Sequence, residues 1–465
     1  MGLTRTLYIG AFAHSTSPQD LDICARGAIG VDESGRIKFI ERDGTIPGAI
    51  LDKYGWRGAI IVETVGHGFF FPGFIDTHTH ASQYPNAGIF GKSTLIDWLD
   101  TYTFPMEGSF SDLYKARTVY TRFVDRLLSH GTTTAAYYAT IHVPATNLLA
   151  DICHSKGQRA FIGRVCMDAM SPDYYRDASP SSAVEATKAT IQHITKLDPT
   201  NDFITPIITP RFAPSCTTPC LFALGQLHKE TNLPIQTHIS ENAAEIQMVK
   251  DLFPQYHSYA AVYDALGLLT SKTILAHAIH LSPSETSLIK VRNSKISHCP
   301  ASNTSLTSGS LHARKLLDEG LTVSLGTDVS GGYSPSILTA ARHAIFVSRH
   351  VAMSEGDTAK LTNEEVLWMA TRAGAQTLGL EKKVGGFEVG MEWDAQMVVL
   401  SGVEGEAEEV IRGPVDVFGW ESWEDKIAKW LYNGDDRNTV AVWVKGRRVH
   451  STCQYRVHVE STEGR

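Results

Sequence analysis

Short apolar segments alternate with amphipathic stretches through the middle of the chain. The amphipathic stretches include Leu113 to His130, Ala183 to Leu197 and Asn363 to Leu378, whose apolar positions recur with a helical period. Eight apolar segments have the length and composition of buried strands, and each precedes a stretch that can form a helix. These segments are 74–78, 132–138, 160–167, 204–209, 235–239, 274–276, 295–298 and 322–326. The pattern predicts eight consecutive βα units.

Eight βα units over about 310 residues favour an α/β fold of the (β/α)8 TIM-like barrel type. Both ends of the chain have a strand-like pattern instead: 26–42 predicts a hairpin, and 395–400 and 440–449 predict further strands. We therefore expect a barrel domain over residues 73–384 and a small β-sandwich domain formed by residues 1–72 together with 385–465. A doubly wound sheet is the alternative, but it usually carries a glycine-rich phosphate turn, which the sequence lacks.

Composition narrows the partners of the protein. Of its 465 residues 43% are hydrophobic and 20% charged, with a formal net charge of −8 and no basic run, so we expect no nucleic-acid partner. No apolar stretch approaches the roughly 18 residues of a transmembrane helix, so we expect no membrane association. The seven cysteines form no Cys-x-x-Cys pair, which favours reduced thiols and a cytoplasmic location.

Histidines and one aspartate stand where predicted strands give way to polar loops. The first strand runs into Asp-Thr-His-Thr-His, and the strand period places His78 and His80 on one face. His238 and His277 end the fifth and sixth strands, and Asp328 follows the eighth. The carboxyl ends of barrel strands meet at one mouth, so these five side chains are expected to converge.

Three imidazoles and a carboxylate suit zinc and leave an open position for a water molecule. The segment 204–210 contains no lysine that could bridge a second metal ion, so one zinc ion per chain is expected. His67, His142, His280 and His298 could be nominated on position alone, and for these four we favour structural roles.

Glu241 follows His238 by three residues and is placed to move protons at the mouth. Zinc would lower the pKa of its water, and the resulting hydroxide would attack a ring carbon that bears an amine. Glu241 would pass a proton to the ring nitrogen and then to the leaving amine, Asp328 would orient the nucleophile, and His277 would stabilise developing charge. A helix-capping role is the alternative for Glu241. His-Glu-x-x-His, Gly-x-Ser-x-Gly and Walker A patterns are missing, which argues against zincin, serine-hydrolase and P-loop chemistry.

Several segments resemble the amidohydrolase superfamily and, within it, the guanine deaminase family. The resemblance extends from about Tyr8 to Val449, and the Pro-Gly-Phe-Ile-Asp-Thr-His-Thr-His signature ending at His80 carries the superfamily part. The more specific segments are 81–84 with Gly88, 98–99, 102–105, 131–134, 209–212, 238–242, 298–300 with 302–303, 326–329, 331–334 and 434–438.

The resemblance implies hydrolytic deamination of guanine to xanthine and ammonia, in purine catabolism or salvage, by a homodimer. Zinc would be bound by His78, His80, His238 and Asp328, with His277 beside the metal; iron can occupy such sites. Catalysis would fall to Glu241, Asp328 and His277. Substrate contacts would come from His80, Gln83, Arg211, Phe212, His238, Glu241 and Asp328.

Gln83 would bind the purine edge, Phe212 would pack against it, and Arg211 would donate to the guanine carbonyl oxygen, which adenine replaces with an amine. A structural salt bridge is the alternative for Arg211. Two rival functions stay open: a related deaminase with another ring substrate, and an inactive scaffold, against which the complete ligand set speaks.

Overall fold

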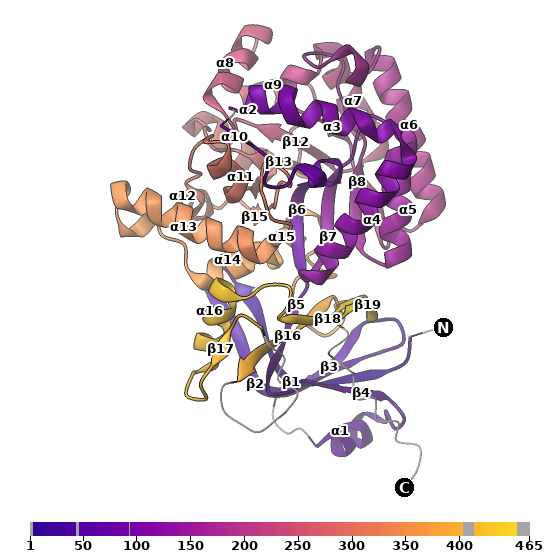
Figure 1. Cartoon of the computed structure of the whole chain (residues 1–465), viewed down its shortest axis with the longest axis vertical. Helices are drawn as coiled ribbons and strands as arrows, with labels where there is room; N and C mark the ends of the chain where they lie inside the picture. The colour runs from indigo at the N-terminus through magenta and orange to yellow at the C-terminus, as the bar shows by residue number, and fades with distance from the viewer. Residues whose placement is uncertain (1–2, 43–45, 93, 403–412, 453–465) are drawn as a thin grey trace.

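The computed structural model describes residues 3–42, 46–92, 94–402 and 413–452. A helix-rich part with a core of strands lies above a β-rich part in Figure 1. All eight predicted strands are present in the helix-rich part, within a few residues of the expected bounds. They are β6 (Phe74–His80), β7 (Thr132–Tyr138), β8 (Arg159–Gly163), β10 (Ile204–Pro206), β12 (Ile235–Ile239), β13 (Thr273–His277), β14 (Lys295–His298) and β15 (Val323–Leu325).

These strands form two parallel sheets of four, β10-β8-β7-β6 and β12-β13-β14-β15. Short strands β9 (Val165–Cys166) and β11 (Thr209–Pro210) pair with each other beyond the first sheet. An isolated parallel bridge between Ile208 and Ile235 joins the sheets on one side. On the other side Thr77 Oγ1 donates to the carbonyl oxygen of Leu325 at 2.9 Å, without a continuous ladder between β15 and β6 among the described residues. The fold is thus α/β with the expected strand order.

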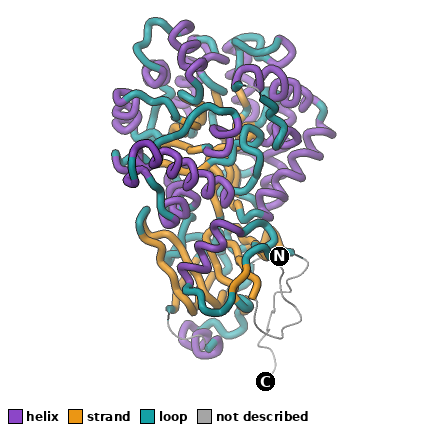
Figure 2. Tube along the Cα trace, turned by 60° about the vertical axis from the view of Figure 1, so that its left-hand side comes forward, coloured by secondary structure: helices purple, strands orange, loops and turns teal. Residues whose placement is uncertain are grey.

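Helices cover the outside of these strands (Figure 2). In α4 (Leu113–Ser129) the buried positions, including Tyr120, Val124 and Leu127, recur at helical spacing, and the Asp112 carboxylate caps the first turn. The other helices of this part after α4 and before residue 360 are α5 (Val143–Lys156), α6 (Pro180–Leu197), α7 (Thr218–Thr231), α8 (Ala243–Leu252), α9 (Tyr259–Ala265), α10 (Pro283–Arg292), α11 (Pro300–Ser305), α12 (Ala313–Asp318) and α13 (Ile337–Glu355).

The stretch predicted as one helix from Asn363 to Leu378 is two helices, α14 (Asn363–Ala370) and α15 (Arg372–Thr377). The break lies at Thr371, whose φ of −131° and ψ of −83° are not helical. Its hydroxyl donates to the carbonyl oxygen of Leu367 at 2.7 Å. Threonine hydroxyls bond to the backbone in this way and bend helices, an effect that apolar periodicity does not register.

The β-rich part is built from both ends of the chain. Its nine-stranded sheet runs β19-β18-β16-β5-β1-β2-β3, with β4 paired to β1 and β17 to β16. The predicted hairpin is β2–β3, and the strand-like segment 440–449 lies in a second antiparallel pair, β18–β19. The elements are β1 (Thr6–Ser17), β2 (Asp20–Val31), β3 (Ile37–Glu41), α1 (Pro47–Tyr54), β4 (Ile60–Glu63), β5 (His67–Pro72), β16 (Ala395–Gly402), β17 (Asp416–Val417), β18 (Thr439–Val444) and β19 (Arg447–Ser451). Residues 453–465 of the predicted C-terminal segment lie outside the described residues.

Trp430 connects the two parts. It lies on α16 (Trp423–Asn433), is fully buried, and stacks on Phe74 at the start of β6 with ring centroids 5.8 Å apart. Its ring also contacts Phe69 and Phe71 of β5 at 5.3 and 5.1 Å. One side chain thus packs against the central strand of the β-rich sheet and the first strand of the helix-rich part.

Replacing Trp430 with alanine is expected to lower the free energy of unfolding by about 3–5 kcal/mol, because a large aromatic side chain leaves a cavity between the two parts. Thermal and urea unfolding measure the effect. Trp420→Ala is the matched control: Trp420 is 78% exposed, and its loss is expected to cost less than about 0.5 kcal/mol. Equal losses in the two variants would contradict the packing role.

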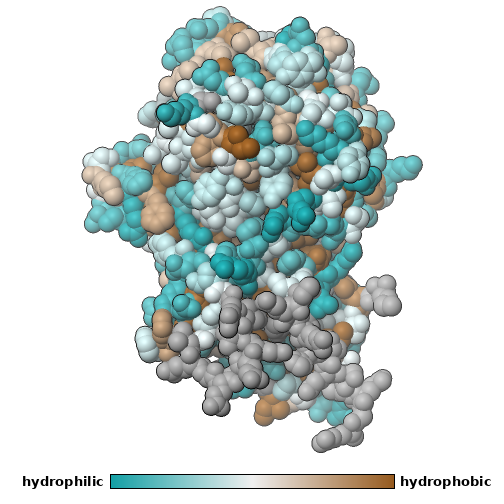
Figure 3. All heavy atoms as spheres, in the orientation of Figure 1, coloured by the Kyte–Doolittle hydropathy of each residue, from teal (hydrophilic) through white to brown (hydrophobic). Residues whose placement is uncertain are grey.

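One face of the described surface is mainly hydrophilic (Figure 3), and the described cysteines form no disulfide. On the face shown in Figure 3, hydrophilic side chains cover much of the described surface and apolar ones form small separate spots. Within the described ranges, no helix is long and apolar enough to span a bilayer. The six cysteines that the structure describes are buried free thiols.

Candidate functional site

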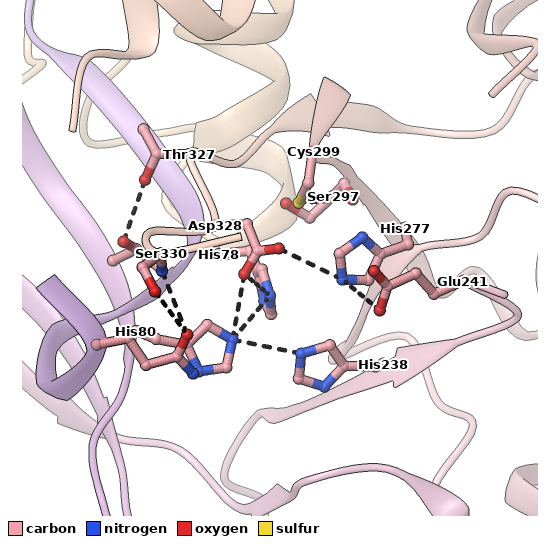
Figure 4. A network of polar contacts seen from close by, with 12 residues as sticks. His78, His80, His238, Glu241, His277, Ser297, Cys299, Thr327, Asp328 and Ser330 are labelled. Atoms are coloured by element: carbon pink, nitrogen blue, oxygen red, sulfur yellow. Dashed lines mark hydrogen bonds and ion pairs between the residues drawn. The ribbon is translucent and has the colours of Figure 1, made fainter. Parts of the chain in front are cut away.

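The five residues expected at the mouth converge in the structure (Figure 4). His78 Nε2 and His80 Nε2 lie 3.2 and 3.3 Å from Oδ1 of Asp328, and His80 Nε2 lies 3.3 Å from His238 Nε2. Oδ2 of Asp328 lies 3.8 Å from His277 Nε2. All five side chains are buried at the carboxyl ends of β6, β12, β13 and β15. Strands from both sheets therefore contribute to one cluster.

Backbone and amide acceptors orient two of the imidazoles. His238 Nδ1 donates to the carbonyl oxygen of Arg211 at 2.6 Å, and His277 Nδ1 donates to Oδ1 of Asn303 at 2.8 Å. Nδ1 carries the proton in these contacts, and Nε2 of each ring faces the cluster. This arrangement is typical of histidines that bind a metal through one nitrogen and are held through the other.

The electrostatics favour the ligand forms of His78, His238 and Asp328. Burial lowers the pKa of His78 to about 4 and that of His238 well below its usual range. Burial alone would raise the pKa of Asp328, but His78 and His80 hold it well below its usual range. Neutral imidazoles and an ionised carboxylate are the forms that bind metals, and a cation among the facing nitrogen atoms would relieve their mutual repulsion. The donor set therefore fits a divalent metal such as zinc.

The strand ends turn sharply at the cluster. His277 and Asp328 have φ values of 70° and 47°, which place two non-glycine residues in the left-handed region. Beside Asp328, the amide and hydroxyl of Thr327 donate to the buried carboxylate of Asp76 at 3.1 and 2.5 Å. Asp76 thus ties the turn that carries Asp328 to β6, which carries His78 and His80.

Glu241 lies between β12 and α8 and faces the cluster. Its carboxylate is 3.4 Å from His277 Nε2 and accepts from the hydroxyl of Ser308 at 3.4 Å. Asn242 caps α8, so the side chain of Glu241 does not serve the capping role considered as its alternative. Burial raises the pKa of Glu241 to about 7, while His277 favours its ionised form. A carboxyl group with such a pKa can accept and return a proton near neutral pH.

A pocket of about 390 Å³ opens onto these groups. Its lining combines apolar and polar side chains, as suits a flat heteroaromatic ligand. The apolar lining comes from Leu95 and Trp98 of α2 (Leu95–Trp98), Leu99, Phe212 and Leu306. The polar lining, called the polar wall below, is His80, Gln83, Arg211, His238, Glu241, His277 and Asp328. The apolar and polar lining together include all seven residues that were expected to contact a substrate, Phe212 among them.

The sequence analysis missed Glu107, on α3 (Phe104–Gly108) behind the polar wall. Its carboxylate accepts from Gln83 Nε2 at 2.7 Å, from Arg211 Nη1 at 2.6 Å and from the hydroxyl of Tyr175 at 2.8 Å. Arg211 therefore makes the salt bridge considered as its alternative role and lines the pocket as well. The only signal in the sequence is a single acidic residue between apolar positions.

Two of the histidines assigned structural roles bond to backbone carbonyl groups. His142 Nε2 lies 3.1 Å from the oxygen of Gly108, and His280 Nε2 lies 2.8 Å from that of Ser308. His298 is fully buried at the end of β14, and His67 lies at the start of β5 in the β-rich part. None of the four belongs to the cluster.

Comparison with known proteins gives a consistent picture. The amidohydrolase family model matches residues 69–449. A probable guanine deaminase of Schizosaccharomyces pombe is 47% identical over 96% of this chain and 84% of its own length, and the Homo sapiens guanine deaminase is 40% identical over 95% and 96%. The solved guanine deaminase of C. acetobutylicum, with guanine bound in its active site, matches with a TM-score of 0.86 and 33% identity over 96% of this chain and 100% of that one. This chain belongs to the amidohydrolase family and, within it, to the guanine deaminases.

Proposed function

We propose that the protein deaminates guanine hydrolytically, giving xanthine and ammonia. The observation that carries the proposal is one pocket in which a metal-binding cluster, Glu241 and the donor pair Gln83 and Arg211 face the same space. The guanine deaminases at 40–47% identity support the choice of substrate.

We assign the metal to His78, His80, His238 and Asp328, and propose one zinc ion per chain. Bound there, zinc would supply Lewis-acid activation of a water molecule. The four residues would hold the metal, and Asp328, whose Oδ2 lies 3.8 Å from His277 Nε2, would orient the attacking water.

Glu241 carries the proton transfers in this proposal. Its Oε2 accepts a proton from the attacking water, whose oxygen forms a bond to the guanine carbon that bears the amine. The carboxyl group returns that proton to the adjacent ring nitrogen. A second proton from the added hydroxyl reaches the amine by the same route, the carbon–nitrogen bond breaks, and ammonia leaves. His277, 3.4 Å from Glu241, stabilises the developing negative charge.

The polar wall accounts for the preference for guanine over adenine. Gln83 and Arg211 offer hydrogen-bond donors, which the carbonyl oxygen of guanine can accept. Adenine places an amine there, which leaves buried donors unpaired at a cost of about 1–3 kcal/mol for each. His80, Phe212 and His238 complete the contacts with the ring.

We further propose how the chain is organised. The two four-stranded sheets would form a closed (β/α)8 barrel over residues 73–384, and residues 1–72 with 385–465 would form a small β-sandwich. The protein would act as a homodimer in the cytoplasm, where thiols stay reduced.

Purified protein loaded with zinc, incubated separately with guanine, adenine and cytosine, tests the proposed function. Guanine alone is expected to release ammonia, with about one zinc ion per chain by metal analysis. A zinc-loaded protein that leaves guanine unchanged and deaminates another ring would keep the mechanism and overturn the assignment of Gln83 and Arg211. Protein that folds but takes up no metal would overturn the ligand assignment.

A further inference from the structure

The side chain of Glu107 is fully buried and lies outside the lining of the pocket. Its two oxygens divide the contacts: Oε1 accepts from Gln83, while Oε2 accepts from Arg211 and Tyr175. A carboxylate without access to water needs such donors, since burying an unpaired charge is costly. Two of its three donors belong to the polar wall.

The contacts of Gln83 fix which way its amide points. Nε2 donates to Glu107 Oε1 at 2.7 Å, and Oε1 of the amide accepts from the backbone N–H of Ser330 at 3.2 Å. A carboxylate can only accept and a peptide N–H can only donate, so the reverse orientation would lose both bonds. The second hydrogen on Nε2 is then the group that Gln83 can offer to a ligand.

Arg211 is held by the same carboxylate. Nη1 donates to Glu107 Oε2 at 2.6 Å, and the guanidinium lies over the ring of Phe104 with Cζ 5.3 Å from the ring centroid. Burial would raise the pKa of Glu107, but Arg211 holds it below its usual range, so the carboxylate is charged. The charges of Arg211 and Glu107 therefore balance, and Arg211 can donate to a ligand through its other N–H groups.

We infer that Glu107 is a positioning residue for substrate selection: from behind the pocket wall it holds Gln83 and Arg211 as paired donors, so that the site selects purines with hydrogen-bond acceptors on the facing edge. The inference rests on the proposed function, because it assigns a role within guanine binding. It adds to that function a residue that does not touch the substrate but determines which hydrogen-bond donors Gln83 and Arg211 offer to it.

Glu107→Gln tests the inference. An amide at residue 107 removes the charge and places an N–H donor opposite groups that themselves donate to Glu107. We expect kcat/KM for guanine to fall about 10- to 100-fold, mainly through KM, because charge-assisted hydrogen bonds are lost. The inhibition constant of 2-aminopurine, which has the amine but lacks the carbonyl oxygen, is expected to change less than about threefold. The preference for guanine over 2-aminopurine should therefore shrink.

Glu392→Gln is the matched control. Glu392 is a buried carboxylate that accepts from Arg159 and Arg36, each at 2.8 Å, away from the pocket. Its replacement removes a buried charge as Glu107→Gln does. We expect Glu392→Gln to lower the midpoint of thermal unfolding and to leave KM for guanine and the base preference unchanged. This separates a loss of stability from a loss of positioning.

A double-mutant cycle tests whether Glu107 acts through the wall. Adding Glu107→Gln to Arg211→Gln should reduce kcat/KM for guanine by less than about threefold, since residues that act through one contact are not additive. Metal content is measured in each variant and is expected to equal that of the wild type. A full additional loss in the double variant would contradict the coupling.

An unchanged KM and base preference in folded, metal-loaded Glu107→Gln would overturn the inference, as would equal losses for guanine and 2-aminopurine. If that variant does not fold, Tyr175→Phe provides the answer: it removes one donor to Glu107 and keeps the ion pair. KM for guanine should then rise about 3- to 10-fold, and no change would count against the inference. Failure of the proposed function is distinct, because the wild-type protein would then not deaminate guanine.

Discussion

Glu241→Gln is expected to lower kcat for guanine about 10³-fold, with the metal retained. The amide keeps the size of the side chain and its contact with Ser308 but cannot accept and return a proton. General acid–base groups contribute about 10²- to 10⁴-fold to rates, and in the proposed mechanism Glu241 alone carries out every proton transfer. Steady-state kinetics together with metal analysis measure the result.

Glu230→Gln is a suitable control, because Glu230 is an exposed residue near the end of α7. Its kcat should match the wild type. If Glu241→Gln kept kcat within about tenfold of the wild type, another group would have to move the protons. A loss of metal in Glu241→Gln would instead point to a role in the metal site.

His238→Ala is expected to abolish metal binding and to lower activity at least about 10⁴-fold, since the cluster loses a ligand and the attacking water loses its activation. Binding to the native state alone also stabilises it: zinc at 1,000 times its dissociation constant adds about 4 kcal/mol to the free energy of unfolding. Chelated wild-type protein should therefore melt at a lower temperature and recover both stability and activity when zinc is added, whereas His238→Ala should respond in neither.

His193→Ala serves as the control for a lost imidazole. His193 lies on α6, outside the site, where Nε2 is 2.8 Å from the carboxylate of Asp151. This variant should retain metal and activity. A zinc-dependent rise in the melting temperature of His238→Ala as large as that of the wild type would contradict the assignment of this ligand.

Local pattern was sufficient for the strands and for the convergence of the histidines and Asp328 at their carboxyl ends. Each strand is a short apolar run, and parallel strands around one axis bring their carboxyl ends together, so the ends themselves mark His78, His238 and Asp328 as neighbours. The pattern was not sufficient where side chains compete with the backbone. Thr371 interrupts a helix whose apolar period continues across it, because its hydroxyl bonds the carbonyl oxygen of Leu367.

The contacts of Glu107 behind the polar wall could not be predicted from local sequence pattern, for another reason. Glu107 and Arg211 are 104 residues apart, and Tyr175 lies in a different connection again. Three connections between strands must be placed before these groups meet, and no period or motif encodes that meeting. A buried glutamate in an apolar stretch indicates that donors must be near it without indicating which ones.

The position of β5 in the sheet affects how the chain emerges during synthesis. β5 ends at Pro72, yet one of its neighbours, β16, begins only at Ala395. At roughly 5–20 residues per second, a ribosome needs on the order of tens of seconds to supply the second neighbour. Throughout that interval a strand with three consecutive phenylalanines, 69–71, has an open edge. The nascent chain is therefore vulnerable to aggregation at this strand, and a chaperone that binds aromatic segments would find its target there long before the active site exists.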